Sequence, residues 1–160
     1  PSAGEREQQE LLSAVDDLWD RGIMVVAAAG NNGPKDNSVT IPGISRKIVT
    51  IGSSDDGKSE PGKRGLKTGY SSNGPTACCI VKPEILAPGT AIKSCGREKN
   101  GYQVKSGTSM AAPVVTGALA LAFQKYPYLS PAEMKLPCLQ RKCTGFMSIM
   151  QRASDGRQSF

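Results

Sequence analysis

The sequence predicts an α/β fold in which a parallel sheet is flanked by helices, and three observations lead to this prediction. Residues 23–29 form an unbroken apolar run of strand length, IMVVAAA, which is typical of a parallel strand that is buried on both faces. A second short apolar run follows at residues 48–52. Segments with helical character precede the first run and follow the second, at residues 5–19 and 108–123.

Composition limits the classes of function. The length of 160 residues suits one domain, and 38% hydrophobic residues allow a modest core. Apolar runs stay below the roughly 18 residues of a membrane span, so we expect no membrane partner. The net charge is +6 without clustered basic and aromatic residues, and we therefore expect no nucleic-acid partner. A signal peptide is not visible, but the chain also starts without Met, so this says little about the parent protein.

The first expected element is an amphipathic helix that covers the sheet. Ser2 and Glu5 have the spacing of a capping box, and Gly22 is a natural helix stop. Apolar residues recur between them at helical spacing: Leu11, Leu12, Val15, Leu18 and Trp19. We expect residues 23–29 to follow as the central strand, with residues 48–52 beside it.

The middle of the chain is predicted to be a charged loop and three short strands. Residues 53–67 mix both charge signs, which is typical of a solvated loop. Their carboxylates Asp55, Asp56 and Glu60 lack the alternation of an EF-hand, so we assign no metal there. Strands are expected at residues 85–87, 91–94 and 102–105, and the last two should form a hairpin with its tip at residues 98–101.

The last third predicts two helices and a divergent tail. The helix from residue 108 should stop near Tyr126. Ser130 and Glu133 form a second capping box that should start a short helix through Leu136. Pro137 is expected to end that helix. Residues 137–160 have no apolar period, and we interpret them as a disordered or frameshifted tail.

The segment GTSMAAP, residues 107–113, starts the long helix. A tight glycine turn places hydroxyl residues at the helix N-terminus, where partial positive charge and unpaired N–H groups favour a developing negative charge. A serine nucleophile would suit this position. The alternative is a Thr or Ser that serves only as an N-cap.

A second segment, VVAAAGNNGP at residues 25–34, ends the first apolar run. Loops at the carboxyl ends of parallel strands are where α/β sheets bind ligands, so Asn31 is a candidate site residue. The alternative is a simple turn residue, because Asn and Gly dominate turns.

Together, and in this order, the two segments resemble the nucleophile and oxyanion-asparagine motifs of the subtilisin-like serine proteases, the subtilases. The similarity covers about residues 1–136 and includes KPEILAPG at residues 82–89. The competing G-x-S-x-G elbow does not fit, because Ala111 stands where that motif needs its second glycine.

The resemblance implies a mechanism and a set of site residues. Ser109 would attack a peptide carbonyl, and the oxyanion would lie between the Asn31 side-chain amide and the Ser109 backbone N–H. The remaining implied residues bind substrate: Ala27, Ala28, Ala29 and Gly30 beside the pocket for the side chain that precedes the scissile bond, together with Gly107 and Thr108. The partner is a peptide or protein substrate. We assign no cofactor, and calcium is kept as a candidate for the complete domain only.

The chain departs from the family pattern in one decisive respect. It contains no histidine, and the aspartate and histidine motifs of the family lie upstream of anything present. It therefore resembles the C-terminal portion of a catalytic domain, an incomplete subtilisin-like fold whose upstream half would supply Asp and His. Three hypotheses follow: a fragment of an active serine endopeptidase, a catalytically dead remnant that binds peptides or nothing, and an α/β domain with a chance match.

Five cysteines, Cys78, Cys79, Cys95, Cys138 and Cys143, make an odd count without the spacing of a zinc site. We expect free thiols. Unpaired cysteines favour a reducing compartment such as the cytoplasm, with secretion as the alternative.

Overall fold

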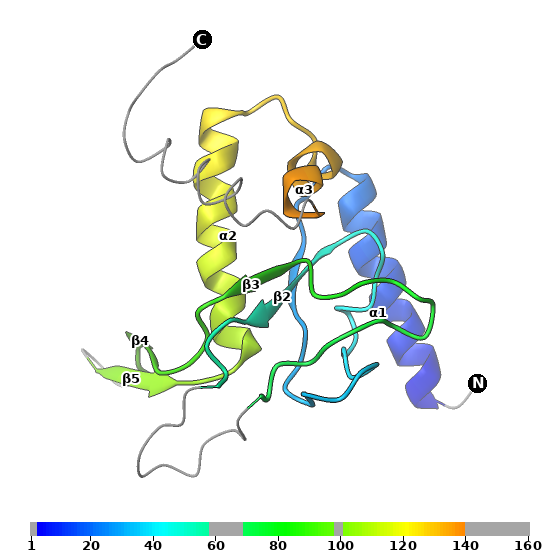
Figure 1. The fold of residues 1–160 in the computed structure, drawn as a ribbon. Coiled ribbons are helices and arrows are strands. Elements are labelled where there is room, and N and C mark those ends of the chain that lie inside the picture. The colour runs from blue at the N-terminus through cyan, green and yellow to red at the C-terminus, as the bar shows by residue number, and fades with distance from the viewer. Residues whose placement is uncertain (1–2, 58–68, 98–100, 140–160) are drawn as a thin grey trace.

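The computed structural model describes residues 3–57, 69–97 and 101–139. Within these residues the chain forms three helices and five short strands (Figure 1). In chain order these are α1 (Ala3–Asp20), β1 (Val26–Ala28), β2 (Val49–Ser53), β3 (Ile85–Ala87), β4 (Ile92–Cys95), β5 (Tyr102–Lys105), α2 (Thr108–Lys125) and α3 (Pro131–Leu139). The predicted α/β class is confirmed.

The parallel sheet has the strand order β1-β2-β3. Val26 pairs with Val49 and Ile51 pairs with Ile85, both in parallel register. All five residues of β2 are buried. The expectation that residues 23–29 form the central strand is wrong for the described sheet, in which β1 is an edge strand and Ile23 is 49% exposed. An apolar run of strand length predicts a strand but does not determine its neighbours.

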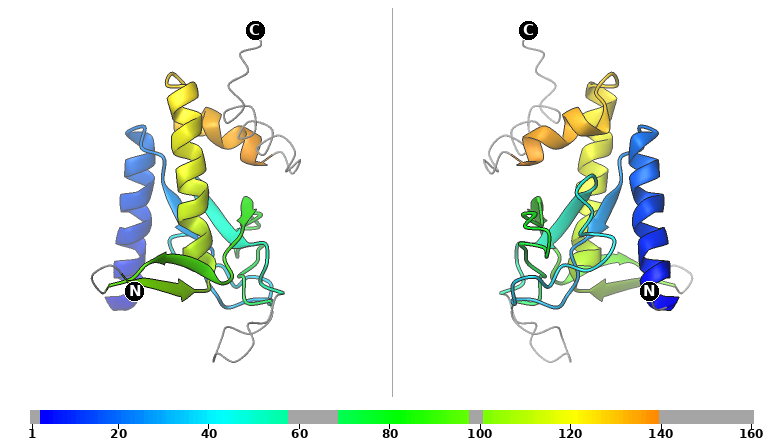
Figure 2. Two further views of the ribbon diagram at one scale, coloured as in Figure 1. Left: turned by 90° about the vertical axis from the view of Figure 1, so that its left-hand side faces the viewer. Right: turned by 90° about the vertical axis from the view of Figure 1, so that its right-hand side faces the viewer.

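Helices α1 and α2 cover opposite faces of the sheet (Figure 1). In the side views, α2 is nearer the viewer from one side and α1 from the other (Figure 2). Alternation along the strands explains this arrangement, because successive side chains point to opposite faces. Val49 and Ile51 pack with Val115 and Leu119 of α2, whereas Ile48 packs with Val15 of α1. The core therefore has two parts, one on each side of the sheet.

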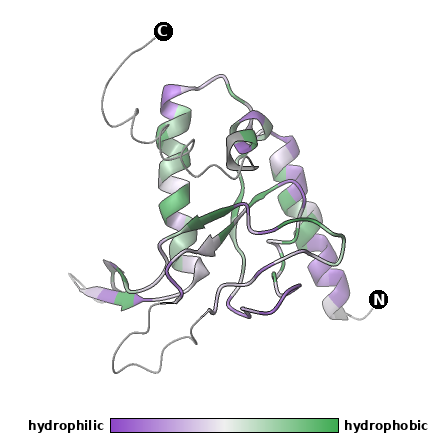
Figure 3. Ribbon diagram, viewed as in Figure 1, coloured by the Kyte–Doolittle hydropathy of each residue, from purple (hydrophilic) through white to green (hydrophobic). Residues whose placement is uncertain are grey.

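Helix α2 is apolar along most of its length (Figure 3). Its buried side is made of Thr108, Ala111, Val115, Leu119 and Ala122, but Val114 and Leu121 on other sides are 45% and 50% exposed. Within the part of the chain that the structure describes, no helix combines the length and hydropathy needed to cross a bilayer.

The predicted ends of α1 and α3 agree with the structure in two places and differ in one. The N–H groups of Gly22 and Ile23 bond the carbonyls of Trp19 and Leu18, which is the Schellman arrangement expected at a glycine stop. Ser130 and Glu133 form the reciprocal capping box, with the Ser130 N–H 2.8 Å from a Glu133 carboxylate oxygen. The expectation that Pro137 ends α3 is wrong, because the helix continues to Leu139. An interior proline removes one N–H donor and crowds the carbonyl four residues before it, but its φ is helical, and here the helix continues for two more residues.

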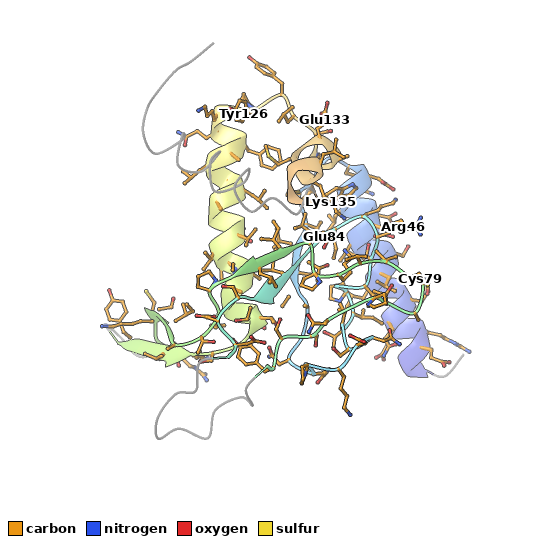
Figure 4. All side chains as sticks on the ribbon, viewed as in Figure 1. Arg46, Cys79, Glu84, Tyr126, Glu133 and Lys135 are labelled. Atoms are coloured by element: carbon orange, nitrogen blue, oxygen red, sulfur yellow. The ribbon has the colours of Figure 1, made fainter. Side chains whose placement is uncertain are left out.

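A buried ion cluster of Lys82, Glu84 and Lys135 helps to attach α3 to the sheet, and Figure 4 shows Glu84 next to Lys135. One Glu84 carboxylate oxygen accepts from Lys82 Nζ at 2.7 Å and from Lys135 Nζ at 2.8 Å. Lys135 also donates to the backbone carbonyls of Arg46, Lys47 and Ile48. Burial lowers the pKa of Lys82, and the neighbouring Glu84 carboxylate offsets part of that effect.

The antiparallel hairpin of β4 and β5 is confirmed, with Ile92 opposite Lys105. Most of its predicted tip lies outside the described residues, as do Ser2 of the first capping box and residues 140–160 of the predicted tail. Three cysteines, Cys78, Cys79 and Cys95, are free and exposed, as predicted. The side chain of Cys138, like Cys143, is outside the described part.

Candidate functional site

The N-terminus of α2 is held by a contact between two glycine segments. Gly107 is the N-cap residue, with φ of 148°, and its N–H donates to the Gly89 carbonyl at 2.8 Å. A Cβ at Gly89 would come within 2.9 Å of the Gly107 carbonyl oxygen. The close contact between these two backbone segments therefore requires glycine at position 89. Gly107 has no side chain that could cap this helix end. The alternative of a hydroxyl N-cap is therefore wrong.

The hydroxyl of Thr108 bonds to the loop that follows β1. This fully buried side chain accepts a hydrogen bond from the Gly30 N–H at 3.1 Å and donates to Asn31 Oδ1 at 3.1 Å. The Thr108 backbone N–H also donates to Asn31 Oδ1, at 3.0 Å. The structure thus joins two segments that lie 77 residues apart in the sequence.

Asn31 is oriented by these contacts. Its Oδ1 accepts two hydrogen bonds, so the two N–H donors of Nδ2 are directed elsewhere. Nδ2 lies 3.3 Å from the position that a Cβ on Gly107 would occupy, which places the amide donor beside the N-cap of α2. The side chain spans two distant segments instead of closing a local turn on its own backbone, so the simple turn interpretation is insufficient.

Ser109 is exposed on the first turn of α2. Its side chain forms no hydrogen bond within the described residues, and the residue directly before it holds Asn31. A hydroxyl at this position experiences the partial positive charge of the helix N-terminus. An exposed hydroxyl and an oriented amide donor are therefore neighbours at one end of α2.

The alanines of the predicted substrate pocket occupy different environments. Ala27 packs with Val15 and Ile48 on the α1 side of the sheet. Ala29 is fully buried and Ala28 is partly buried. Gly30 has φ of 103°, and a Cβ there would meet the Thr40 hydroxyl oxygen at 2.6 Å. The substrate-binding role of residues 27–30 stays a prediction.

Sequence reasoning missed a polar network beneath the N-terminus of α2. Asp55 Oδ1 accepts from the N–H groups of Gly89 and Thr90 at 2.8 and 3.0 Å and from the Ser53 hydroxyl at 3.0 Å. The Tyr70 hydroxyl bridges Ser53 and Thr90. Burial raises the pKa of Asp55, but these hydrogen bonds outweigh it and leave the pKa below its ordinary value. Asp55 thereby fixes Gly89, the acceptor for Gly107.

The interpretation of residues 53–67 as a solvated loop is thus wrong at its described beginning, where Ser53 is buried and Asp55 is half-buried. Residues 58–67 are outside the described part. No feature of the sequence could have revealed this network, because its partners come from three separate segments, residues 53–55, 70 and 89–90. Among the described residues, no group of three or more His, Cys, Asp or Glu side chains could hold a metal ion.

An apolar groove of about 600 Å³ lies away from this site, between α1 and two loops. It is lined by Gln8, Leu11, Asn37, Val39, Thr40, Ile41, Ile44, Thr76, Ala77, Cys78 and Ile80. Neither Asn31 nor Ser109 belongs to this lining.

Comparison with known proteins gives consistent results. The sequence model described as the subtilase family matches residues 2–144. The chain is 39% identical over 146 residues to serine protease AprX of Bacillus subtilis (strain 168), covering 82% of this chain and 33% of AprX. It is 35% identical over 127 residues to subtilisin DY of Bacillus licheniformis, covering 78% of this chain and 41% of subtilisin DY.

Solved structures show the same relationship. The fold is similar to that of the S41 psychrophilic protease, with a TM-score of 0.64 and 32% identity, over 78% of this chain and 41% of the other. A cold-adapted subtilisin-like serine proteinase has a TM-score of 0.63 and 32% identity, over 81% of this chain and 42% of the other. The chain therefore spans 33% to 42% of the length of these relatives.

Proposed function

The chain belongs to the subtilase family, and from this premise we propose that it is the part of a serine endopeptidase that carries the nucleophile and the oxyanion donor. Ser109 attacks the scissile carbonyl. The Asn31 side-chain amide and the Ser109 backbone N–H stabilise the oxyanion that forms. The observation that carries this proposal is the hydrogen bond from the Thr108 N–H to Asn31 Oδ1, at 3.0 Å. It directs the amide donor towards the helix end that bears Ser109.

The general base comes from outside these 160 residues. Acyl transfer by a serine requires an imidazole to accept the hydroxyl proton, and the chain contains no histidine. An upstream half of the domain therefore supplies histidine and aspartate, either in the same polypeptide or as a folded partner. Residues 1–136 form the catalytic portion, and residues 137–160 are a divergent tail.

Exposed apolar surface supports a missing partner of this kind. Helix α2 is apolar on several sides, yet Val114 and Leu121 are 45% and 50% exposed. Strand β1 is an edge strand of the described sheet, and its free backbone groups can pair with a further strand. We assign no cofactor to this reaction. Calcium stays a candidate ligand of the complete domain only, with no role in the reaction.

The proposal is tested by measuring peptide cleavage in the assembled domain, by which we mean this chain together with the upstream half that supplies histidine and aspartate. The 160-residue chain alone should not cleave peptides at a protease-like rate, because a serine without a base is a weak nucleophile. Adding the upstream half should give cleavage that serine-directed reagents block. Ser109→Ala should abolish this cleavage. Asn31→Ala should lower kcat about 10²–10³-fold with little change in KM, a magnitude taken from a subtilisin.

Two control variants separate catalysis from folding. Ser13→Ala changes an exposed serine on α1, and Gln124→Ala changes an exposed amide in the last turn of α2. Both should retain full activity. Activity that survives Ser109→Ala in the assembled domain would overturn the proposal. A domain that binds peptides but never cleaves them would favour the catalytically dead alternative.

A further inference from the structure

We propose that Ser72 is a positioning residue that holds the backbone on both sides of Asn31 and thereby aims the oxyanion amide. This inference rests on the proposed function. Ser72 is fully buried, and no sequence motif distinguishes it from the other serines of the chain. Its contacts are what single it out.

Ser72 bonds to the residue before Asn31 and to the residue after it. Its N–H donates to the Gly30 carbonyl at 3.0 Å. Its Oγ accepts from the Asn32 N–H, also at 3.0 Å. The same Oγ lies 3.1 Å from the position that a Cβ on Gly30 would take. One buried residue therefore determines where both peptide groups around Asn31 lie.

The neighbouring backbone supports this arrangement independently of the Ser72 side chain. The Gly33 N–H donates to the Tyr70 carbonyl at 2.9 Å. Together with the hydrogen bond from the Ser72 N–H to the Gly30 carbonyl, this contact holds residues 30–33 against residues 70–72. Removal of the Ser72 hydroxyl leaves both backbone bonds in place, so its effect should be confined to the peptide between Asn31 and Asn32.

The amide of Asn31 needs an anchor at each end. Thr108 holds the far end by two hydrogen bonds to Oδ1, but Asn31 itself is exposed and follows Gly30, whose φ of 103° is freely adopted only by glycine. Catalytic donors must be held to within about 0.5 Å of the productive geometry. Ser72 supplies the near anchor that keeps this exposed loop in place.

Kinetics of the assembled catalytic domain test the role. Ser72→Ala should lower kcat roughly 3- to 10-fold with KM nearly unchanged, the size expected for loss of one neutral hydrogen bond. In the Asn31→Ala background, Ser72→Ala should lower kcat no further, because the amide that it positions is gone. Ser13→Ala, which changes an exposed serine on α1, is the matched control and should leave both backgrounds unchanged.

Amide hydrogen exchange gives a readout that does not depend on turnover. In the assembled domain carrying Ser109→Ala, which prevents self-digestion, Ser72→Ala should speed exchange at Asn32 several-fold, while Gly33 keeps its protection. An unchanged Asn32 rate would overturn the proposal. So would an unchanged kcat, or a fall in kcat that persists in the Asn31→Ala background. Failure of the proposed function would appear differently, as activity that survives Ser109→Ala.

Discussion

Thr108 connects the two segments of the candidate site through a single hydroxyl. It accepts from the Gly30 N–H and donates to Asn31 Oδ1, and the side chain is fully buried. If the Thr108 hydroxyl is removed, the Gly30 N–H loses its acceptor and Asn31 Oδ1 loses one of its donors. An unsatisfied buried polar group of this kind costs about 1–3 kcal/mol. Valine has the same shape as threonine but no hydroxyl, so a change of Thr108 to valine removes these hydrogen bonds and little else.

Thr108→Val should therefore lower kcat of the assembled domain by about tenfold, since Asn31 Oδ1 keeps only one of its two donors. It should also reduce the free energy of unfolding, which denaturant titration measures. Thr116→Val is the matched control, because Thr116 is an exposed threonine of the same helix whose hydroxyl bonds only the Ala112 carbonyl. Equal kcat values for the two variants would contradict this role of Thr108.

Asp55 makes stability depend on pH in a defined direction. Hydrogen bonds from Gly89, Ser53 and Thr90 outweigh the opposing effect of burial and lower its pKa. The unfolded chain, with an Asp pKa of about 3.9, takes up the proton first as the pH falls. The stabilisation is thus complete above that pKa and is lost as the pH falls through the lower, folded pKa.

Unfolding free energies of the wild type between pH 6 and pH 3 should therefore decline at the acid end more steeply than those of Asp55→Asn. The amide keeps an acceptor oxygen but does not titrate. Asp36→Asn, at an exposed aspartate, should decline as the wild type does. Parallel curves for the wild type and Asp55→Asn would show that Asp55 makes no such contribution.

At the scale of elements, α3 is attached to the sheet by Met134, which is buried in the core cluster with Val49, and by the polar contacts of Lys135. Lys135 reaches the Glu84 carboxylate and three backbone carbonyls of residues 46–48. Its Nζ also lies 5.7 Å from the centre of the Trp19 ring, so α1, α3 and the start of β2 meet at this point. Without Lys135, Glu84 keeps its ion pair with Lys82, but the carbonyls of Arg46 and Lys47 lose this donor.

Lys135→Met should reduce the free energy of unfolding by about 1–3 kcal/mol, the cost of leaving buried acceptors without their donor. The fluorescence of Trp19, the one tryptophan of the chain, should change in the folded state. Lys35→Met, at an exposed lysine, should change neither quantity. A stability loss no larger than that of the control would mean that packing alone docks α3.

At the scale of the whole molecule, apolar surface remains uncovered. Large apolar side chains more than 40% exposed lie on both the sheet and α2: Leu86, Val114 and Leu121. The chain covers 33% of AprX and 41% of subtilisin DY. Patches of this kind mark interaction surfaces or cause aggregation.

The purified chain should therefore bind a hydrophobic dye such as ANS and should aggregate as its concentration rises. Addition of the upstream half should reduce both effects, because we propose that this partner covers the exposed surface. Light scattering and dye fluorescence measure them. A chain that stays monomeric at high concentration and binds no dye would contradict this expectation.

The sequence alone determined much of the local structure and the family of the chain. The glycine stop at Gly22, the capping box at Ser130 and the hairpin of β4 and β5 depend on neighbouring residues, and all three appear as predicted. The two motifs around Asn31 and Ser109 also identified the family, because residue types at fixed spacing are a local property. The long-range arrangement could not be predicted in the same way.

Tertiary structure alone decided which strands are neighbours and what holds the site together. Residues 23–29 lie at the edge of the described sheet rather than at its centre, because an apolar run specifies burial but not order. The contacts of Thr108, Ser72 and Asp55 join residues between 34 and 78 positions apart. A hydroxyl or a carboxylate has many potential partners, and only the folded chain selects among them.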